Sequence, residues 1–465
     1  MTHQERLLAV LGPLREAFPG DQQLWLVGGA VRDVLLGRPL ADWDLVTLGD
    51  AEATARGYAS TIRAPVFPLS ERHGAWRVVG GTHEVDVTGA PDGIDADLAR
   101  RDLTVNAIAV RVADGAIAAV PGALDDVAAG VLRAVSDRSF LDDPLRLLRL
   151  VRLAAELGLA IDPATGVQAR RDASQAAAPA GERQQAELSR ILLARDPVDA
   201  LLQLEDLGLL AVVLPEVAAL RGVSQNRYHH LDVLDHTLQV LDAATDLATH
   251  PAGTFGPAAS AVVAALAVPL DADADVALAV RWGALLHDIA TPTTRVVRED
   301  GHVAFPGHAQ EGAEVAVAIL SRLRCSTALQ RCVAVLVREH LRLGFLVSEE
   351  GLDARSVFHY RQATDSWGIA SVIVSLADRW STRGTKARQR WIRRHEQLAV
   401  AMALALTQPV PEPLLRGDAL AVAIGCKPGP ELGRLLALIA EEQAAGTLAS
   451  PADAIAFARA RHLSE

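Results

Sequence analysis

The sequence predicts a multidomain α+β protein in which a head with a small mixed β-sheet and helices is followed by all-helical domains. Three observations lead to this fold class. Over about the first 130 residues, short β-type runs alternate with turns rich in glycine and aspartate. After about Val131 the apolar residues recur almost wholly at helical spacing. Aromatic residues make up only 4% of the chain and alanine and leucine fill most apolar positions, which favours helices packed on helices.

The 465 residues suggest several domains, at roughly 100–200 residues each. We expect the head at residues 1–130, a helical neck at 131–222, a third helical domain at 223–400 and a helical tail at 401–465. The proline-rich stretch Pro409–Pro413 marks the linker before the tail.

Individual elements follow from the local pattern. Five short apolar runs in the head are predicted strands: Leu24–Val27, Asp44–Thr47, Trp76–Val79, Glu84–Thr88 and Val105–Val110. Farther along, Leu145–Leu157 has apolar residues at helical spacing and Gly158 supplies a stop signal. The stretch from Pro251 to Asp275 is rich in Ala, Pro, Gly and Asp, so we expect a loop or an insertion there.

Charge and cysteine content restrict the partners and the compartment. The formal net charge is −12, so a nucleic acid must be held by local basic patches rather than by the field of the whole molecule. The three cysteines form no CxxC pair and cannot build a paired disulfide framework. The N-terminus lacks a signal-peptide core, and no uncharged apolar run approaches the ~20 residues of a membrane span. We expect a soluble cytoplasmic protein with no membrane partner and no obligate protein partner.

The strongest local motif is LVGGAVRDVLLGRPLADWDLVT. Gly28 and Gly29 let the backbone approach a phosphate closely, and the helix that follows offers free N–H groups and a positive dipole end. Asp42 and Asp44 lie at i and i+2 on the next strand and share a face, so they can hold Mg²⁺ ions. Such ions can activate an attacking hydroxyl and neutralise a leaving pyrophosphate. Arg32 is placed to contact phosphate.

This motif closely resembles the nucleotidyltransferase head of the bacterial class II tRNA nucleotidyltransferases and poly(A) polymerases. The stretch ARRDLTVNAIAV is similar to the ribose- and phosphate-binding strand of that family. The resemblance implies that Arg101 contacts the triphosphate and that Asp102 and Asn106 select a ribose 2′-hydroxyl, for which their side chains are suitable partners. Glu84 and Asp86 share a strand face, and either is a candidate third metal-site acid or part of a surface pair.

The stretch DDPLRLLRLVRLAAELG is similar to the acidic–Asp–x–x–Arg motif of the family. At helical spacing Asp143 and Arg146 share a face and can present acceptors and donors to the Watson–Crick edge of a base. Arg149 and Arg152 continue the same stripe. Most family members have glutamate where this chain has Asp142, which shortens the reach of that side chain by one methylene.

Two further matches bear on specificity and on the neck. In CCA-adding relatives a longer flexible loop precedes the strand with the RRD motif, whereas only Gly89–Ala99 lies before Arg100 here. The family ties that loop to the switch from adding C to adding A, so its near-absence favours CC addition over full CCA addition. The helix GERQQAELSRILLA also matches, and Glu182 and Arg183 are expected to be structural there.

A second constellation lies in the third domain. Histidines and aspartates with metal-ligand character recur beside apolar helical runs, at His236, His287, Asp288, His308, His340 and Asp378. This ordered series resembles an HD phosphohydrolase domain, which implies a divalent transition metal. The family usually reads HD-I-G-K, but Ala290 and Thr291 stand here, so the lysine that could bind a substrate phosphate is gone. We expect metal binding, with hydrolysis as an accessory activity.

Basic segments are candidates for RNA contact. Seven Lys and Arg residues lie between Arg379 and Arg394 with two tryptophans among them, which fits a phosphate-binding patch through Lys386 and Arg390; a solvated helix face is the alternative. The tail segment PLLRGDALAVAIGCKPGPELGRLL resembles the C-terminal element of the family, which reaches the far end of tRNA. Lys427 and Arg434 would supply charge there.

These observations predict transfer of CMP, and in a wider version also AMP, from CTP and ATP to the 3′-hydroxyl of tRNA, which is held at its acceptor stem and elbow, with Mg²⁺ as cofactor. One alternative is a poly(A) polymerase of the same family. Another is a metal phosphohydrolase whose head has become an RNA-binding module, and a third is a non-catalytic tRNA-binding protein.

Overall fold

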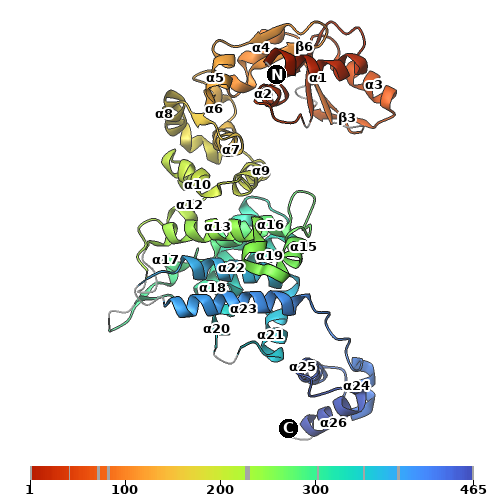
Figure 1. Cartoon of the computed structure of the whole chain (residues 1–465), viewed down its shortest axis with the longest axis vertical. Coiled ribbons are helices and arrows are strands. Elements are labelled where there is room, and N and C mark those ends of the chain that lie inside the picture. The colour runs from red at the N-terminus through yellow and green to blue at the C-terminus, as the bar shows by residue number, and fades with distance from the viewer. Residues whose placement is uncertain are drawn as a thin grey trace. The chain divides into compact units, whose positions relative to one another are not determined.

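The computed structural model describes residues 3–40, 42–70, 74–80, 84–225, 231–300, 303–348, 351–384 and 388–462. The chain forms two compact units, one of residues 1–195 and 199–213 and the other of residues 196–198 and 214–465 (Figure 1). The predicted α+β class is confirmed, because the head holds one mixed sheet and the rest is mainly helical. The division into four domains stays a prediction.

The head is built on a seven-stranded sheet in the order β3-β4-β5-β2-β1-β6-β7. Strands β2 and β5 run parallel, and the other neighbouring pairs are antiparallel. The strands are β1 (Leu24–Val27), β2 (Trp43–Thr47), β3 (Val66–Ser70), β4 (Ala75–Val78), β5 (Val85–Gly89), β6 (Ile108–Arg111) and β7 (Ile117–Ala119). Four of the five predicted strands are therefore confirmed to within one residue at each end.

The fifth predicted strand begins later than expected. Thr104–Asn106 form a 3₁₀ turn, and β6 starts only at Ile108. The side chain of Asn106 donates to the carboxylate of Asp102, at 3.0 Å, and such local bonds compete with extended backbone. The turn brings both polar side chains to the end of the strand.

Helices cover both faces of the sheet. They are α1 (His3–Ala17), α2 (Gly29–Leu35), α3 (Ala51–Ile62) and α4 (Ile94–Ala99). Trp43 contacts Tyr58 of α3, with ring centroids 6.1 Å apart, whereas Val46 lies in a buried cluster with Leu98 of α4. Because alternate residues of a strand point to the same face, Asp44 lies on the α4 side with Val46.

The neck follows within the same unit. Its elements are α5 (Ala123–Ala129), β8 (Val131–Leu132), α6 (Ser139–Asp142), α7 (Arg146–Leu157), β9 (Ala160–Ile161), α8 (Pro163–Asp172), α9 (Gly181–Leu192), α10 (Pro197–Asp206) and α11 (Leu210–Val213). Helix α7 matches the predicted helix and ends at Gly158, whose φ of 66° suits glycine. Helix α7 packs against α9.

The second unit is a helical bundle around α16, followed by a small tail. Its elements before the tail are α12 (Pro215–Ala218), α13 (Val233–Thr249), α14 (Pro251–Phe255), α15 (Ala259–Leu266), α16 (Val276–Leu286), α17 (Thr291–Thr294), β10 (Val296–Val297), β11 (Val303–Ala304), α18 (His308–Arg322), α19 (Thr327–Glu339), α20 (Arg342–Phe345), α21 (Ala354–Thr364), α22 (Gly368–Ser381) and α23 (Gln389–Thr407). Helix α16 packs against α13, α19 and α22.

The expectation of a loop from Pro251 to Asp275 was wrong in part, because α14 and α15 occupy most of that stretch. Pro251 stands in the first turn of α14, where a missing N–H costs nothing, and alanine and valine dominate α15.

The tail is helical and has its own core. Its helices are α24 (Gly417–Ile424), α25 (Pro430–Ala444) and α26 (Pro451–His462). Leu420, Leu435 and Ala454 are among its buried residues, one from each helix. The proline-rich segment before α24 has no helix or strand, as a linker requires. Across the described ranges we found no helix with the length and apolar character needed to cross a membrane.

Candidate active site and metal centre

A glycine turn connects β1 to α2 and receives an arginine. Gly28 has a φ of 68°, in the left-handed region that favours glycine. A Cβ atom at Gly28 would lie 2.4 Å from Nη1 of Arg101, so that guanidinium occupies the space that a side chain would fill. Arg101 also pairs with Asp97 of α4 at 2.9 Å. The turn and a cation thus lie together where phosphate binding was predicted.

Two aspartates follow this turn in the sequence, and Asp44 lies beside it, with Oδ2 3.8 Å from where a Cβ atom of Gly29 would stand. Asp42 is exposed just before β2, and Asp44 is half-buried on the strand. Burial raises the pKa of Asp44, and the nearby charge of Asp86 raises it further, while Arg101 and Arg149 oppose the change. Asp44 and Asp86 are direct neighbours across the parallel pair β2 and β5. A divalent cation would relieve this repulsion between carboxylates.

The candidate third acid already has a partner. Arg77 on β4 donates from Nε and Nη2 to the two carboxylate oxygens of Asp86, both at 2.8 Å. The same guanidinium lies 3.3 Å from Glu84. Both candidates are therefore bound to one arginine, and Asp86 acts on Asp44 through its charge.

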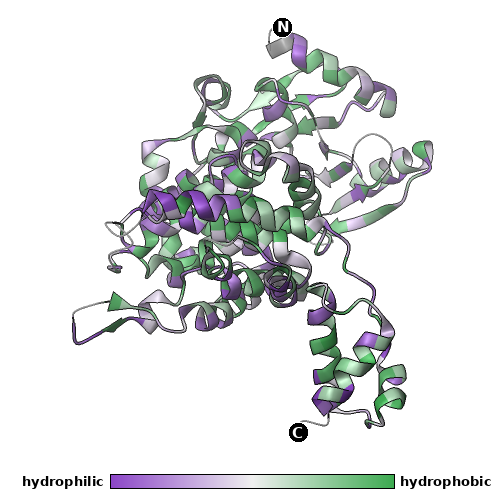
Figure 2. Cartoon of the chain, turned by 60° about the horizontal axis from the view of Figure 1, so that its bottom comes forward, coloured by the Kyte–Doolittle hydropathy of each residue, from purple (hydrophilic) through white to green (hydrophobic). Residues whose placement is uncertain are grey.

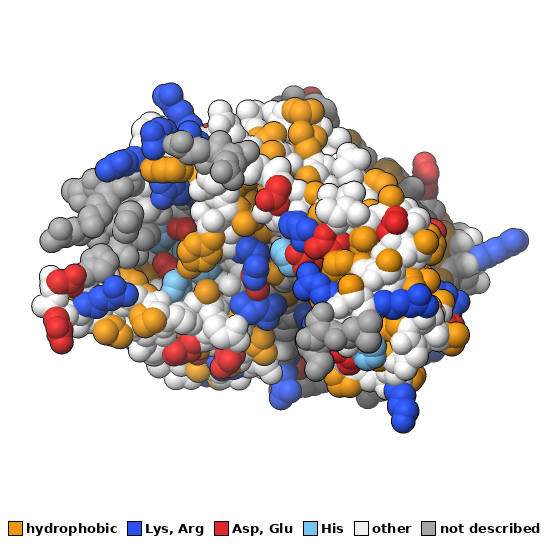
Figure 3. Space-filling view, turned by 90° about the horizontal axis from the view of Figure 1, so that it is seen from below, with side chains coloured by type: hydrophobic (Ala, Val, Ile, Leu, Met, Phe, Trp, Pro, Cys, Tyr) orange, Lys and Arg blue, Asp and Glu red, His pale blue; other side chains and the backbone are white. Residues whose placement is uncertain are grey.

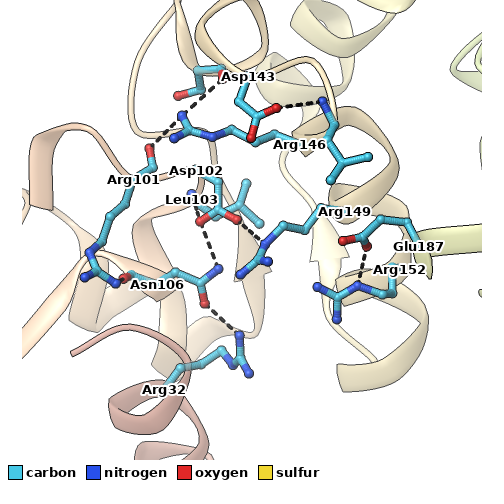
Figure 4. Close-up of polar contacts among 12 residues, drawn as sticks. Arg32, Arg101, Asp102, Leu103, Asn106, Asp143, Arg146, Arg149, Arg152 and Glu187 are labelled. Atoms are coloured by element: carbon cyan, nitrogen blue, oxygen red, sulfur yellow. Dashed lines mark hydrogen bonds and ion pairs between the residues drawn. The ribbon is translucent and has the colours of Figure 1, made fainter. Parts of the chain in front are cut away.

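A continuous chain of polar contacts runs from the head to the neck (Figure 4). Nη1 of Arg32 donates to Asn106 Oδ1 at 2.7 Å, and Asn106 Nδ2 donates to Asp102 Oδ1 at 3.0 Å. Nε of Arg149, on α7, donates to the other oxygen of Asp102 at 2.6 Å. Burial alone would raise the pKa of Asp102, but the charge of Arg149 and hydrogen bonds from Asn106 and Leu103 outweigh it and lower this pKa.

The motif expected to contact the base is arranged differently from the prediction. Asp143 and Arg146 do not share a helix face, because α7 begins only at Arg146 and Asp143 has extended backbone, with φ −144° and ψ 101°. Pro144 explains this, since a residue before proline avoids the helical region. Arg146 donates to the backbone carbonyls of Arg100, at 2.7 Å, and of Ser139, at 3.2 Å.

A residue that sequence reasoning assigned only to structure contacts this motif. Arg183 on α9 pairs with the carboxylate of Asp143 at 2.9 Å. Arg183 stands one residue after Glu182 in a stretch that matched the family, but its partner is 40 positions away, so no local spacing could reveal the contact.

Arg152 does not continue the stripe of Arg149. Its side chain is 3% exposed and lies 2.5 Å from Glu187 and 2.7 Å from Glu156. Figure 4 shows Arg152 and Glu187 to one side of the group around Asp102. Arg152 therefore joins α7 to α9 and does not face the space beside Asp102.

The six predicted metal ligands of the third domain lie close together. They stand at or near the ends of α13, α16, α18 and α19 and within α22. They form two groups, His236 with His287 and Asp378, and Asp288 with His308 and His340, each with its ligand atoms within 4.8 Å of one another. Asp288 contacts both groups. Its Oδ2 lies 3.5 Å from His287 Nε2, and its Oδ1 lies 3.4 Å from His308 Nε2.

Backbone carbonyls orient three of the imidazoles. Nδ1 of His287, His308 and His340 lies 2.8, 2.8 and 2.7 Å from a carbonyl oxygen. A carbonyl can only accept, so Nδ1 carries the proton and Nε2 presents its lone pair to the cluster. Burial lowers the pKa of His340 to about 4, which keeps it in the neutral form that binds metals. The donor set therefore fits divalent transition metals.

The basic residues proposed to contact RNA lie elsewhere in the second unit. Arg390 is exposed at the start of α23, and Lys427 is exposed before α25. Arg434 on α25 pairs with Glu431 through two bonds of 3.1 Å. Lys386 lies outside the described residues.

Comparisons with known proteins agree with both the predicted nucleotidyltransferase head and the predicted HD domain. Residues 24–91 and 84–133 match the poly A polymerase head domain, residues 158–220 match the probable RNA and SrmB-binding site of polymerase A, and residues 233–383 match the HD domain. The class of protein is thus a nucleotidyltransferase with an HD domain, and both domains imply the use of divalent metal ions.

Relatives define the family more closely. The chain is 35% identical to the A-adding tRNA nucleotidyltransferase of Deinococcus radiodurans, covering 93% of this chain and 94% of the relative. It is 36% identical to the CC-adding tRNA nucleotidyltransferase of Thermus thermophilus, covering 95% and 93%. The chain belongs to this family of tRNA nucleotidyltransferases.

Solved structures show the same fold. A Thermotoga maritima CCA-adding enzyme in complex with tRNA matches with a TM-score of 0.64 at 17% identity and covers 99% of both chains. The Bacillus stearothermophilus CCA-adding enzyme in complex with CTP matches with a TM-score of 0.65 at 22% identity, covering 99% of this chain and 98% of that one.

Proposed function

We propose that the chain adds CMP from CTP to the 3′-hydroxyl of tRNA and stops after two additions. The observation that carries nucleotidyl transfer is that Asp44, the Gly28 turn and Arg101 lie together, beside the chain of contacts that passes through Asp102. Carboxylates suited to a metal, a cation suited to phosphate and acceptors suited to a ribose thus lie close together, which supports the proposal.

Asp42 and Asp44 are the residues that would hold Mg²⁺. When bound, the metal activates the tRNA hydroxyl and neutralises the leaving pyrophosphate. Arg101 is held by Asp97 against the Gly28 turn, so its remaining N–H groups are positioned for the triphosphate. Arg77 already forms two hydrogen bonds with Asp86, which favours a metal site with two carboxylate ligands rather than three.

The ribose and the base are selected by separate groups. Asp102 and Asn106, held by Arg149 and Arg32, offer an acceptor and an amide to a 2′-hydroxyl. Asp143 and Arg146 offer complementary groups to the base edge. In this structure Arg183 and the carbonyl of Arg100 hold these two side chains in place. Specific hydrogen bonds to a base edge can thus do the work of a template.

The segment before Arg100 supports the limit of two additions. After β5 the chain turns at once into α4, whose Ile94 and Leu98 are buried in the head core. Asp92 of this segment pairs with Arg100 at 3.2 Å. A short segment folded onto the core cannot act as the mobile loop that the family ties to A addition. The A-adding relative and the CC-adding relative are about equally similar to this chain. The proposed limit of two additions therefore rests on the folded segment and not on sequence identity.

The transfer proposal is tested with purified full-length protein, Mg²⁺, CTP and a tRNA transcript that lacks its CCA end. Asp44→Asn should lower the extension rate by roughly a thousandfold, because it removes a carboxylate that the reaction needs. Asp114→Asn, on an exposed turn of the same head, is the matched control and should leave the rate unchanged. Equal rates for Asp44→Asn and wild type would overturn the assignment.

We propose a second, accessory function in the HD domain, hydrolysis of phosphoesters. The observation behind it is that the two oxygens of Asp288 lie near different groups of candidate ligands, one near His287 and the other near His308, so these residues would hold divalent metal ions. Bound metals lower the pKa of water so that it can attack a phosphoester. Thr291 stands where the family usually has a lysine, so other cations would have to bind the substrate phosphate.

Metal content tests this second proposal without an activity assay. After loading with Mn²⁺ or Ni²⁺ and gel filtration, the protein should keep about two ions per chain. His308→Ala should lower the content towards one ion. His359→Ala, an exposed histidine that pairs with Glu441, is the control and should retain both. Retention of two ions by His308→Ala would contradict the assignment of His308 as a metal ligand.

The tail and the compartment complete the proposal. Lys427 and Arg434 would contact the tRNA elbow. Arg434 would then have to leave its ion pair with Glu431 and bind a phosphate instead. A cytoplasmic location and tRNA as partner fit the enzyme class. A poly(A) polymerase would instead extend RNA many times with ATP alone, so the length of the products separates it from the activity proposed here.

A further inference from the structure

We propose that a strip of arginines beside the HD cluster binds the backbone of single-stranded RNA and leads an RNA end to that cluster. The arginine strip is defined by Arg379, Arg383, Arg388, Arg390, Trp391 and Arg393. Its binding of RNA is independent of any reaction, whereas the fate of the bound end rests on the phosphohydrolase proposed above.

The strip is a local cation patch in an acidic chain. The net charge of the protein is −12, yet residues 379–395 contain seven Lys and Arg and no Asp or Glu. Arg383, Arg388, Arg390 and Arg393 are exposed. Figure 2 shows the first turns of α23 as hydrophilic and its later turns as hydrophobic, so the charge is concentrated at one end of the helix. Such a patch attracts a polyanion.

Contacts place the strip directly beside the metal ligands. Arg379 follows the ligand Asp378, and Oγ1 of Thr382 lies 3.4 Å from the carboxylate oxygen Oδ1 of Asp378. On α23, one turn after Trp391, the buried His395 has its Nε2 3.4 Å from Oγ of Ser375 on α22. The basic start of α23 therefore lies against the end of α22 that carries the ligand.

The cluster is open only on part of its surface. The side chains of His236 and His287 are 1% and 0% exposed, whereas those of Asp378 and His308 are 17% and 16% exposed. A phosphoester must approach from the side of the exposed ligands. Asp378 is one of them, and the strip begins at its neighbour. Figure 3 shows Lys and Arg side chains at its upper left, close to a group of His and acidic side chains.

Trp391 makes the patch suited to a flexible strand. The guanidinium carbons of Arg390 and Arg394 lie 5.0 and 5.2 Å from the centre of its ring system. Cation–π contact orders these guanidiniums, which can donate to phosphates and stack on unpaired bases. Duplex RNA would hide its bases, so a single-stranded end fits this surface better. These arginines also supply the phosphate-binding charge that Thr291 does not provide.

The test uses the full-length protein and a short unstructured RNA with a 3′-phosphate and a 5′ fluorophore. Fluorescence anisotropy over a salt series should show a dissociation constant about tenfold higher for the Arg390→Gln, Arg393→Gln double variant than for wild type. Its log–log salt slope should fall by roughly 0.7 per arginine removed. Thermal unfolding should match wild type, because both side chains are exposed.

Another Arg–Trp pair in the same unit provides the matched control. Arg331 lies 5.6 Å from the Trp367 ring centre and is paired with Asp365 at 2.9 Å. Arg331→Gln should bind the RNA as wild type does. Equal affinities for wild type and the double variant, or an equal loss in Arg331→Gln, would overturn the proposal.

A crosslinking arm locates the RNA end. A 4-thiouridine near the 3′ end should crosslink to peptides of α22 and α23, and crosslinks confined to the head or the tail would contradict the proposal. If the wild type fails to hydrolyse bis(p-nitrophenyl) phosphate with any metal, the phosphohydrolase proposal falls, but the binding and crosslinking results still decide the role of the strip.

Discussion

Arg101 and Gly28 lie in direct contact across the turn between β1 and α2. A Cβ atom at Gly28 would lie 2.4 Å from Nη1 of Arg101 and 3.8 Å from the carbonyl oxygen of Asn106. The glycine therefore does more than relieve backbone strain, because it makes room for the cation that we assign to the triphosphate.

Gly28→Ala should displace Arg101 and raise the KM for CTP roughly tenfold, which corresponds to about 1.4 kcal/mol of lost binding. Gly158→Ala is the matched control, since Gly158 also has a positive φ, of 66°, but no atom lies near its missing side chain. That control should lower stability by about 1 kcal/mol and leave KM unchanged. Initial rates over a range of CTP concentrations give the comparison, and equal KM values in both variants would show that the contact has no role in binding.

Asp102→Asn should destabilise the protein in a pH-dependent way. The folded-state pKa of Asp102 is lowered, so its stabilising effect is present above the unfolded pKa near 4 and is lost as pH falls through the folded value. The difference in free energy of unfolding from wild type should be about 1–3 kcal/mol at pH 7 and should shrink below about pH 4. Urea denaturation at several pH values measures it. A difference independent of pH would mean that the charge of Asp102 is not what holds Arg149.

Arg183→Ala should weaken nucleotide selection without removing transfer. Loss of the 2.9 Å pair leaves Asp143 unsupported, so the ratio of kcat/KM for CTP over ATP should fall by roughly tenfold. Arg190→Ala serves as the control, because Arg190 lies on the same helix but pairs with Glu156. An unchanged CTP/ATP ratio in Arg183→Ala would leave Arg183 with only a structural role.

Arg152→Met should affect stability and not nucleotide binding. Arg152 is 3% exposed and holds Glu187 and Glu156, and removing one member of a buried ion pair costs about 3–5 kcal/mol. A lower melting temperature with an unchanged KM for CTP is the expected result. A raised KM without loss of stability would restore the nucleotide-binding role that the sequence indicated.

The sequence predicted the elements that depend on local pattern. Strand β1, the glycine turn, helix α7 and its stop at Gly158 all follow from alternation, helical spacing or the special conformations of glycine. The six candidate metal ligands of the HD domain could be named because each stands beside an apolar helical run in a characteristic order. Their division into two groups that share Asp288 could not be predicted, since it depends on how five helices pack.

The misses also have physical causes. Helical spacing predicted that Asp143 belongs to the same helix as Arg146, but Pro144 forces Asp143 out of the helical conformation. The stripe also suggested that Arg152 acts with Arg149, whereas Glu187 on α9 draws it into the interior. The partners of Asp86 and Asp143 are arginines on other elements, and no spacing rule reports on such contacts.

The most direct measurement of the central claim uses three tRNA transcripts that end before CCA, after the first C, and after CC. Each is incubated with the purified protein, Mg²⁺, and CTP and ATP separately and together, and the products are sized at single-nucleotide resolution. We predict additions of two, one and no nucleotides respectively, with CTP alone sufficient. Addition of A to any transcript would contradict the CC-adding assignment, and no extension of any transcript at any Mg²⁺ concentration would contradict nucleotidyl transfer itself.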